Sequence, residues 1–372
     1  MTTNILDTGI KVVRNVSGFT VGKGSVSQLA GFVDARRRQA GSAPAVAVFL
    51  IDEFFRQHPD IVARLGVGAD DLVRYVAVAD EPTTDAIDEL TADIRRNLAD
   101  LPVTIVGVGG GTTMDTAKAV ANLLTNGGAA ADYQGWDLVK VPGVHKIAVP
   151  TISGTGAEAT RTCVMTNKKT GLKLGMNSDY TVFDQMVLDP DLTATVPRDQ
   201  YFYTGMDAYI HCVEALRGSY RNAVGDAYSR ETVNLCRQVF LGDDMMSDEA
   251  REKLMVASYL GGCAIATSYV GVVHPFSAGL SVVLGLHHCI ANCIALNALQ
   301  EFYPEEHAEF RSMLAAQNVP LPTGVCSSLS EQQFAQLVAA TVVHAKPLTN
   351  ALGPNFRDIL TDDKVVEIFS RM

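Results

Sequence analysis

In the first half of the chain, short apolar runs alternate with stretches whose apolar positions recur at helical spacing. Apolar runs without alternation are typical of strands that are covered on both faces of a parallel sheet. The strand-like runs are 45–51, 72–78, 102–108 and 146–149, and helical spacing covers 84–97 and 112–124 between them. The order strand, helix, strand predicts a parallel, doubly wound α/β sheet.

From about residue 197 the strand-like runs end and helical spacing dominates. The helices expected there are 199–216, 222–240, 248–266, 287–301 and 331–345. No low-complexity linker separates the halves. We therefore expect an α/β domain over 1–195 and an all-α domain over 196–372, with a ligand site in the cleft between them.

The composition of the chain argues against several classes of function. The 372 residues carry 41 acidic and 30 basic side chains, a net charge of −11, which argues against binding to nucleic acid. The apolar runs are too short to cross a membrane. The segment Met1–Lys11 lacks the charged and apolar pattern of a secretory signal. Seven cysteines without a CxxC pair indicate buried thiols, so we expect a cytoplasmic protein.

A glycine turn follows the third strand-like run. Gly109, Gly110 and Gly111 lead into Thr112 and the next predicted helix. A strand that ends in glycines before a helix lets the backbone approach an anion, and the helix N-terminus attracts it. The motif is not GxGxxG, and a tight turn without a ligand is nearly as good an interpretation.

Two further segments follow strand-like runs. Asp52 stands where a carboxylate can accept hydrogen bonds from ribose hydroxyls, which favours NAD over NADP; a helix N-cap is the alternative. The loop 150–158 contains Thr151, Ser153 and Thr155, hydroxyls that suit contacts to a phosphate or nicotinamide. Such loops are also common without a ligand.

The helical half contains one carboxylate and three imidazoles at suggestive positions. Asp207 and His211 are four residues apart, so they share a helix face, and His274 and His288 follow fourteen residues apart. Together they can hold a divalent ion and leave a position open for a substrate oxygen. Each histidine alone is better interpreted as a hydrogen-bonded core residue; the set favours a metal site.

In this order the motifs resemble the iron-containing alcohol dehydrogenase family, whose fold is shared with dehydroquinate synthase. The glycine triplet with Thr112, Asp115 and Lys118 resembles its phosphate signature. The resemblance implies NAD or NADP, a divalent metal (Fe²⁺ or Zn²⁺) held by the four residues above, and cofactor contacts that include Asp115. Lys173 is a candidate contact to the cofactor or to an acidic substrate, with a solvated lysine as the alternative.

Further segments resemble the subgroup of this family that oxidises the 8-hydroxyl of 3-deoxy-D-manno-octulosonate. These segments are 132–137, 177–185, 202–207 and 301–304. The resemblance implies oxidation of a terminal hydroxyl of a polyhydroxylated sugar acid to an aldehyde, a place in carbohydrate biosynthesis, and a downstream aminotransferase. Ala278 departs from the family, since many members carry a histidine there. Ser277, His287 or a ribose hydroxyl would then relay the proton, or the substrate differs.

We therefore expect a metal- and NAD(P)-dependent alcohol dehydrogenase that acts on a sugar-like primary alcohol. The alternatives are a dehydroquinate synthase-like cyclase with transient NAD redox chemistry, a small-alcohol or polyol dehydrogenase, and a binding protein that has kept the fold. A homodimer is the expected assembly, because it is the commonest.

Overall fold

The computed structural model describes residues 13–41, 45–79 and 81–372, so the segment Met1–Lys11, discussed above for a secretory signal, lies outside the described residues. Two compact units appear. A sheet unit is built from Arg14–Ile152 and Ala157–Thr195, and a helical unit from Val196–Met372 with the short loop Ser153–Gly156. That loop follows a strand of the sheet unit but packs with the helices.

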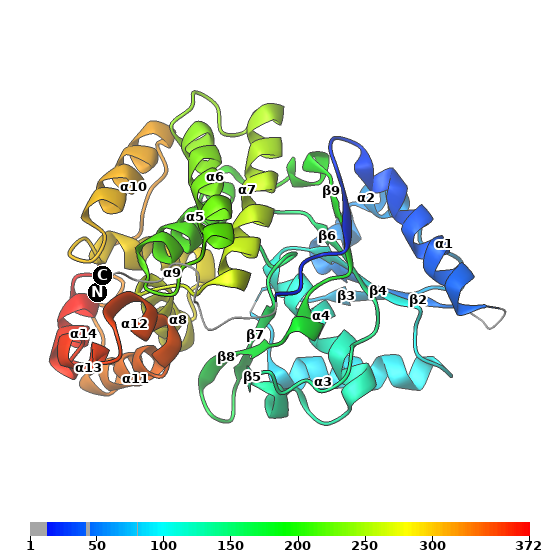
Figure 1. Cartoon of the computed structure of the whole chain (residues 1–372), viewed down its shortest axis with the longest axis horizontal. Helices are drawn as coiled ribbons and strands as arrows, with labels where there is room; N and C mark the ends of the chain where they lie inside the picture. Colours follow the sequence, from blue (N-terminus) through cyan, green and yellow to red (C-terminus); the bar gives the residue numbers. More distant parts are fainter. Residues whose placement is uncertain (1–12, 42–44, 80) are drawn as a thin grey trace. The chain divides into compact units, whose positions relative to one another are not determined.

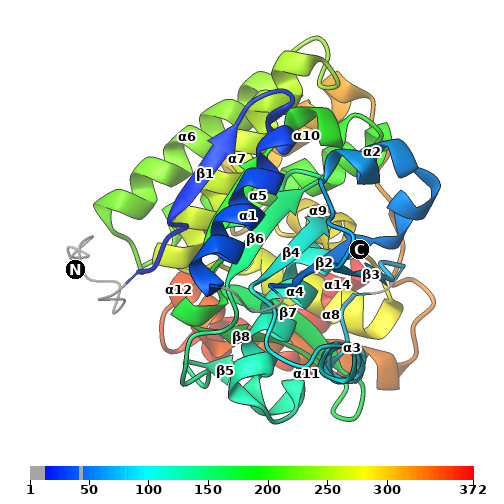
Figure 2. The same ribbon diagram turned by 90° about the vertical axis from the view of Figure 1, so that its right-hand side faces the viewer.

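The sheet unit is organised around six parallel strands in the order β1-β9-β6-β4-β2-β3 (Figures 1 and 2). Their bounds are β1 (Gly18–Val21), β2 (Ala47–Asp52), β3 (Leu72–Val76), β4 (Thr104–Gly109), β6 (Lys146–Pro150) and β9 (Gln185–Leu188). Every pairing in this sheet is parallel, as the alternation of strands and helices predicts. The four strand-like runs form β2, β3, β4 and β6, whereas the four-residue strands β1 and β9 are not predicted by the sequence pattern.

Helices cover both faces of this sheet, which explains why its strands read as continuous apolar runs. Figure 1 shows α1 (Leu29–Ala40) and α2 (Pro59–Arg64) on one side and α3 (Thr84–Asn97) and α4 (Gly111–Asn126) on the other. On the α4 side the packing is close. A Cβ added to Gly107 would lie 3.0 Å from the Cβ of Ala117.

A second, three-stranded sheet in the order β5-β8-β7 was not predicted. It contains β5 (Gly135–Trp136), β7 (Thr162–Asn167) and β8 (Leu172–Asn177), and β7 and β8 form an antiparallel hairpin. The side chains of β7 alternate between buried and half-buried, as in a strand with one covered face. Short 3-10 helices complete the unit: η1 (Ser25–Gln28), η2 (Glu53–Gln57), η3 (Ala130–Tyr133), η4 (Asp179–Thr181) and η5 (Pro190–Thr193).

The described part of the helical unit is all-α. Its helices are α5 (Arg198–Arg217), α6 (Ala223–Phe240), α7 (Asp248–Thr267), α8 (Val273–Leu284), α9 (His288–Ala298), α10 (Pro304–Gln317), α11 (Glu331–Val342), α12 (Ala345–Leu352), α13 (Phe356–Ile359) and α14 (Asp362–Ser370). Every residue from Tyr201 to Ala215 of α5 is buried, so neighbouring helices surround it. All five predicted helices are present, although α9 and α11 end three residues before their predicted ends. No helix in the described ranges combines the length and apolarity needed to cross a bilayer.

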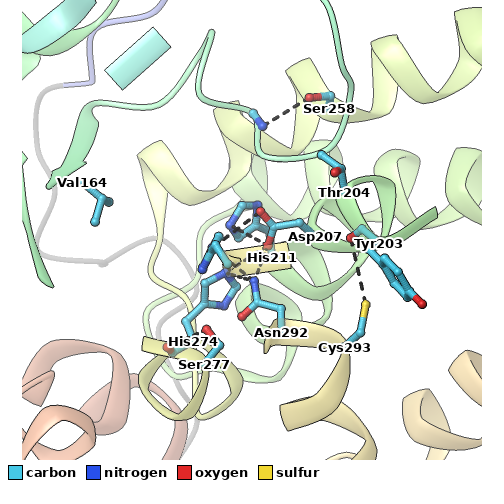
Figure 3. Close-up of polar contacts among 12 residues, drawn as sticks. Val164, Tyr203, Thr204, Asp207, His211, Ser258, His274, Ser277, Asn292 and Cys293 are labelled. Atoms are coloured by element: carbon cyan, nitrogen blue, oxygen red, sulfur yellow. Dashed lines mark hydrogen bonds and ion pairs between the residues drawn. The ribbon is translucent and has the colours of Figure 1, made fainter. Parts of the chain in front are cut away.

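The loop Ser153–Gly156 is fixed in the helical unit by two glycines. A Cβ on Gly154 would lie 1.6 Å from the carbonyl oxygen of Thr204 in α5. Gly156 has φ +62° and donates its N–H to Oγ of Ser258 in α7 at 3.2 Å (Figure 3). Glycine is required at both positions because no side chain fits.

Candidate active site

Three elements of the helical unit bring the predicted ligands together. Asp207 and His211 lie one turn apart on α5, and His274 is the second residue of α8 (Figure 3). His288 is the first residue of α9. One ligand atom each from Asp207, His274 and His288 lies within 4.8 Å of the others. Nε2 of His274 is 3.3 Å from Oδ1 of Asp207, and Nε2 of His288 is 3.7 Å from Oδ2.

His211 lies beside this group of three. Its Nε2 is 3.6 Å from Oδ1 of Asp207, and its ring stacks on that of His274 with centroids 4.6 Å apart. Burial lowers the pKa of His211 to about 4, against the opposing effect of Asp207, so the imidazole is neutral near pH 7. Although burial opposes its ionisation, the three histidines hold the pKa of the Asp207 carboxyl well below its usual range. A neutral imidazole and an ionised carboxylate are the forms that bind metal.

Asn292 was not recognised in the sequence and lies at the centre of this cluster. Its Nδ2 is 2.6 Å from Oδ1 of Asp207, 3.3 Å from Nε2 of His274 and 3.2 Å from Nε2 of His288. The residue is fully buried, and its Oδ1 has no hydrogen-bond partner. Its place four residues after His288, on the same face of α9, is the signal that could have identified it.

Glu214 was missed as well. It follows Asp207 by seven residues on the same face of α5 and is buried. Its carboxylate contacts Nδ1 of His274 and accepts the N–H of Val273 at 2.5 Å. Glu214 therefore reaches the ring nitrogen of His274 that points away from Asp207.

The donor set fits a divalent transition metal. Asp207 is fully buried, and its Oδ2 accepts no hydrogen bond from the protein. A buried carboxylate oxygen without a donor is costly unless a cation meets it. One carboxylate with three imidazoles suits Fe²⁺ and Zn²⁺ alike.

In the sheet unit, the candidate cofactor residues lie at the carboxyl ends of neighbouring strands. Asp52 ends β2, Gly109 ends β4 and Thr151 follows β6, three strands that lie side by side (Figure 2). The chain leaves β2 towards β3 and leaves β4 towards β6, so strand order reverses between β2 and β4. In open parallel sheets, ligands bind outside the carboxyl ends at such a switch point.

The alternative interpretation of Asp52, a helix N-cap, is present in the structure. Oδ1 of Asp52 accepts the N–H of Phe54 at 2.9 Å at the start of η2. Burial raises the pKa of this carboxyl above its usual value, although the bond from Phe54 opposes the shift. The cap uses only one oxygen, so a ribose contact through Oδ2 is compatible with it.

The glycine turn is required by close packing and not by backbone strain, since none of its three glycines has a left-handed φ. A Cβ on Gly109 would lie 2.5 Å from Oγ1 of Thr113, and one on Gly110 would lie 2.9 Å from Cγ2 of Ile152. Thr112 and Thr113 do not cap α4, whose first turn has no side-chain cap, and Oγ1 of Thr113 is buried without a hydrogen-bond partner. Uncapped amides at a helix N-terminus suit a phosphate group.

The remaining candidates differ in their surroundings. Asp115 accepts the N–H of Val164 at 2.8 Å, and burial raises the pKa of its carboxyl to about 6. Lys173 is nearly buried and forms an ion pair with Glu81. Ser153 and Thr155 belong to the helical unit, and the Ser153 hydroxyl is buried without a hydrogen-bond partner.

The proposed substitutes for the family histidine at Ala278 are unequal. Ser277 is fully buried, and its hydroxyl donates to the carbonyl oxygen of His274 at 3.0 Å. His287 is exposed and immediately precedes α9. The hydroxyl proton of Ser277 is therefore engaged in a backbone hydrogen bond, whereas the imidazole of His287 is accessible to water.

Comparison with known families agrees with this architecture. A model of the iron-containing alcohol dehydrogenase family matches residues 19–190, and a model of the C-terminal part of the Fe-containing alcohol dehydrogenase family matches residues 201–370. The chain belongs to the iron-containing alcohol dehydrogenase family.

Curated relatives and solved structures are similar to this chain over much of its length. Sulfoacetaldehyde reductase of Bilophila wadsworthia is 33% identical over 221 residues, which are 58% of this chain and 56% of that protein. 1,3-Propanediol dehydrogenase of Citrobacter freundii is 30% identical over 278 residues, 72% of this chain and 70% of that protein. The structure of sulfoacetaldehyde reductase from Bifidobacterium kashiwanohense in complex with NAD⁺ matches with a TM-score of 0.79 at 23% identity, over 97% of this chain and 98% of that one. This likeness confirms the predicted fold.

Proposed function

We propose that the protein is an NAD(P)-dependent, metal-containing alcohol dehydrogenase that oxidises a terminal hydroxyl to an aldehyde. The observation that carries the proposal is the group of buried Asp207 and half-buried His274 and His288, whose ligand atoms lie within 4.8 Å of one another. A glycine turn at a strand switch point in the other unit supports the cofactor assignment. The domains at 1–195 and 196–372 would then bind the dinucleotide and the metal.

The proposal assigns the two groups to separate sets of residues. Asp207, His211, His274 and His288 would hold Fe²⁺ or Zn²⁺. The residues that would hold NAD(P) are Asp52, Gly109, Gly110, Gly111, Thr112, Asp115, Thr151, Ser153, Thr155 and Lys173. When bound, the metal acidifies the substrate hydroxyl and the nicotinamide accepts the hydride.

The chain's own residues prepare these steps. Asn292 donates to Oδ1 of Asp207, which leaves Oδ2 as the oxygen for the cation. The first turn of α4 has no side-chain cap, so its backbone N–H groups would be available to the phosphates of the cofactor. His287 is the exposed imidazole beside the ligand helix, and the proposal assigns it the release of the hydroxyl proton to water.

The substrate is proposed on the sequence resemblance to 3-deoxy-D-manno-octulosonate 8-oxidase: a terminal hydroxyl of a sugar acid, whose aldehyde a downstream aminotransferase would consume. The alternative is a small alcohol or aldehyde, which the names of the relatives favour: sulfoacetaldehyde reductase and 1,3-propanediol dehydrogenase. A dehydroquinate synthase-like cyclase remains the third outcome of the test below.

The first experiment measures metal content of anaerobically purified protein and NADH formation with sugar acids, diols and hydroxyalkyl sulfonates. About one Fe or Zn per chain with substrate-dependent NADH supports the proposal. Bound metal and substrate turnover without net NADH would replace it by the cyclase. Absence of metal binding after reconstitution with Fe²⁺ or Zn²⁺ would overturn it.

His274→Ala tests the metal centre directly. We expect turnover to fall below detection and the metal stoichiometry to drop, because one of the proposed ligands is lost. His307→Ala, a half-buried histidine of α10, is the matched control and should keep both values. Wild-type turnover in His274→Ala would remove the proposed centre.

Asp52→Gly tests cofactor selection. Loss of the carboxylate removes repulsion of a 2′-phosphate, so the kcat/KM ratio of NAD to NADP should fall. Asp52→Asn keeps an oxygen for the Phe54 cap and separates charge from capping. An unchanged ratio in both variants would show that Asp52 serves only as the cap.

Assembly and location complete the proposal. A homodimer is proposed as the commonest assembly, to be measured by sedimentation. Cytoplasmic location is supported by seven cysteines that are all buried in the described part of the chain.

A further inference from the structure

The proposed reaction does not use one buried carboxylate, which lies beside the proposed metal ligands Asp207, His211, His274 and His288 (the ligand group). Glu214 is 1% exposed and lies on the α5 face that also carries Asp207 and His211, at spacings of seven and three residues. Carboxylates are rarely buried to this extent unless their oxygens accept hydrogen bonds or form ion pairs. Its partners therefore indicate its purpose.

The partners of Glu214 come from the start of α8 and from Tyr303. Oε1 accepts the backbone N–H of Val273 at 2.5 Å, and Oε2 contacts Nδ1 of His274. The hydroxyl of Tyr303 is hydrogen-bonded to Glu214 and accepts the N–H of Val272 at 3.1 Å. One carboxylate thus holds both the backbone and the ring at the point where α8 begins.

The segment before α8 is shaped around these contacts. A Cβ added to Gly271 would lie 2.5 Å from the Tyr303 hydroxyl and 3.1 Å from Oε1 of Glu214. Pro275, the third residue of α8, lies in the first turn, where its missing N–H costs no helical bond. Glycine and proline therefore allow the first turn of α8 to approach α5 closely.

The contact at Nδ1 decides which nitrogen of His274 faces the ligand group. An ionised carboxylate only accepts hydrogen bonds, so Nδ1 must carry the proton. When a metal replaces the proton on Nε2, the ring is neutral and its lone pair is on Nε2, the nitrogen that lies 3.3 Å from Oδ1 of Asp207. Metal-bound histidines commonly donate their other N–H in this way, which orients the ring and strengthens the ligand.

We propose that Glu214 is a positioning residue of the metal centre: it fixes the Nδ1–H tautomer of His274 and the start of α8, and thereby raises the affinity for the metal. The inference rests on the proposed function, since it concerns the same centre. Glu214 is assigned no contact to the substrate or to the metal itself.

Glu214→Gln tests the proposal with a side chain of the same shape. Glutamine has one acceptor oxygen, so it satisfies either Val273 or His274 but not both. We expect the dissociation constant for Zn²⁺ to rise ~10–100-fold in competition with a chromophoric chelator. The d–d absorption of the Co²⁺-loaded protein should also change, because the orientation of the His274 ring changes.

The matched control is Glu309→Gln. Glu309 accepts hydrogen bonds from the Tyr209 hydroxyl and from Arg237 in the same unit, outside the ligand group. It should keep the wild-type Zn²⁺ affinity and Co²⁺ spectrum. If Glu214→Gln does not fold, Glu214→Asp, which keeps both oxygens on a shorter side chain, is measured instead and should also bind Zn²⁺ more weakly.

The outcomes separate this inference from the proposed function. Wild-type Zn²⁺ affinity and Co²⁺ spectrum in a folded Glu214 variant would overturn the inference and leave the proposed function intact. No Zn²⁺ or Co²⁺ binding by the wild-type protein would overturn the proposed function and the inference together. Equal weakening in the Glu309 control would overturn the inference, because the effect would then be general to the unit.

Discussion

At the residue scale, the carboxylate of Asp207 is contacted by one amide, that of Asn292, as well as by the surrounding histidines. Asn292 donates to Oδ1 of Asp207, whereas Oδ2 accepts no hydrogen bond and would be free to bind the proposed metal ion. If Asp207 is a metal ligand as proposed, loss of this donor should weaken metal binding even though Asn292 is not itself assigned as a ligand.

We therefore predict that Asn292→Ala lowers the affinity for Zn²⁺ by ~10-fold or more, measured by chelator competition. Asn297→Ala on the same helix, where the amide oxygen accepts from Arg311, is the control and should bind Zn²⁺ as the wild type does. An unchanged affinity in Asn292→Ala would mean that the Asp207 carboxylate needs no such donor.

A second residue-scale prediction concerns Asp115. Burial raises the pKa of its carboxyl to about 6 from 3.8, so between these values the native state holds a proton that the unfolded chain has lost. Stability contributed by this group therefore falls as pH rises from about 4 to about 6, by up to about 3 kcal/mol.

In Asp115→Asn this pH dependence should disappear. The urea midpoint of the variant relative to wild type should rise from pH 4 to pH 7, measured in metal- and cofactor-free protein. The exposed Asp70→Asn serves as the control and should show no such trend. A midpoint difference that is constant with pH would contradict the assigned burial cost.

At the element scale, the loop Ser153–Gly156 is held by contacts that exclude a side chain. Gly156 and Gly171 have nearly the same left-handed backbone, with φ +62° and +67°. A Cβ on Gly156 would lie 2.6 Å from Cα of Gly262, whereas a Cβ on Gly171 meets nothing within 4 Å. Alanine substitutions at these two glycines therefore distinguish the cost of backbone strain, which both share, from the cost of a steric clash, which only Gly156 has.

Gly171→Ala should cost about 1 kcal/mol of unfolding free energy, the price of a left-handed alanine. Gly156→Ala should cost clearly more, because α7 has to move as well. Urea unfolding of both variants gives the comparison. Equal losses would mean that the loop adjusts without displacing α7.

The length and burial of each element explain how much of the fold could be predicted from the sequence. The parallel strands β2 and β4 are long apolar runs buried on both faces, so the sheet was predictable. The hairpin β7–β8 carries only a weak alternation, with Cys163 and Met165 buried between half-buried neighbours. Strands of four residues, such as β1, contain too few positions for any period to appear.

The candidate site was predictable to a similar extent. Asp207, His211, His274 and His288 have chemistry and spacing that identify them in the sequence. Glu214 and Asn292 act through hydrogen bonds to those residues, and only the packing of α5, α8 and α9 reveals these bonds. Ordinary polar side chains in a helix carry no mark of such a role until their neighbours are known.

At the scale of the whole molecule, the seven cysteines are distributed over both units, and all of them are buried. Burial raises the thiol pKa of Cys212 to about 12 and that of Cys326 to about 11, which suppresses the reactive thiolate. The native protein should therefore show almost no fast-reacting thiols with a disulfide reagent, and all seven in urea. Several fast-reacting thiols before unfolding would contradict this burial.

The loop Ser153–Gly156 has a consequence for how this gene could recombine with its relatives. A crossover at residue 195 would separate the loop from Thr204 and Ser258, the residues that receive it. A chimera made at that point joins one parent's loop to another parent's helices. The two must still pack so closely that no Cβ fits between the loop and the helices. Breakpoints that leave 153–156 and 204–262 from one parent should therefore yield folded chimeras more often than the apparent boundary between the halves.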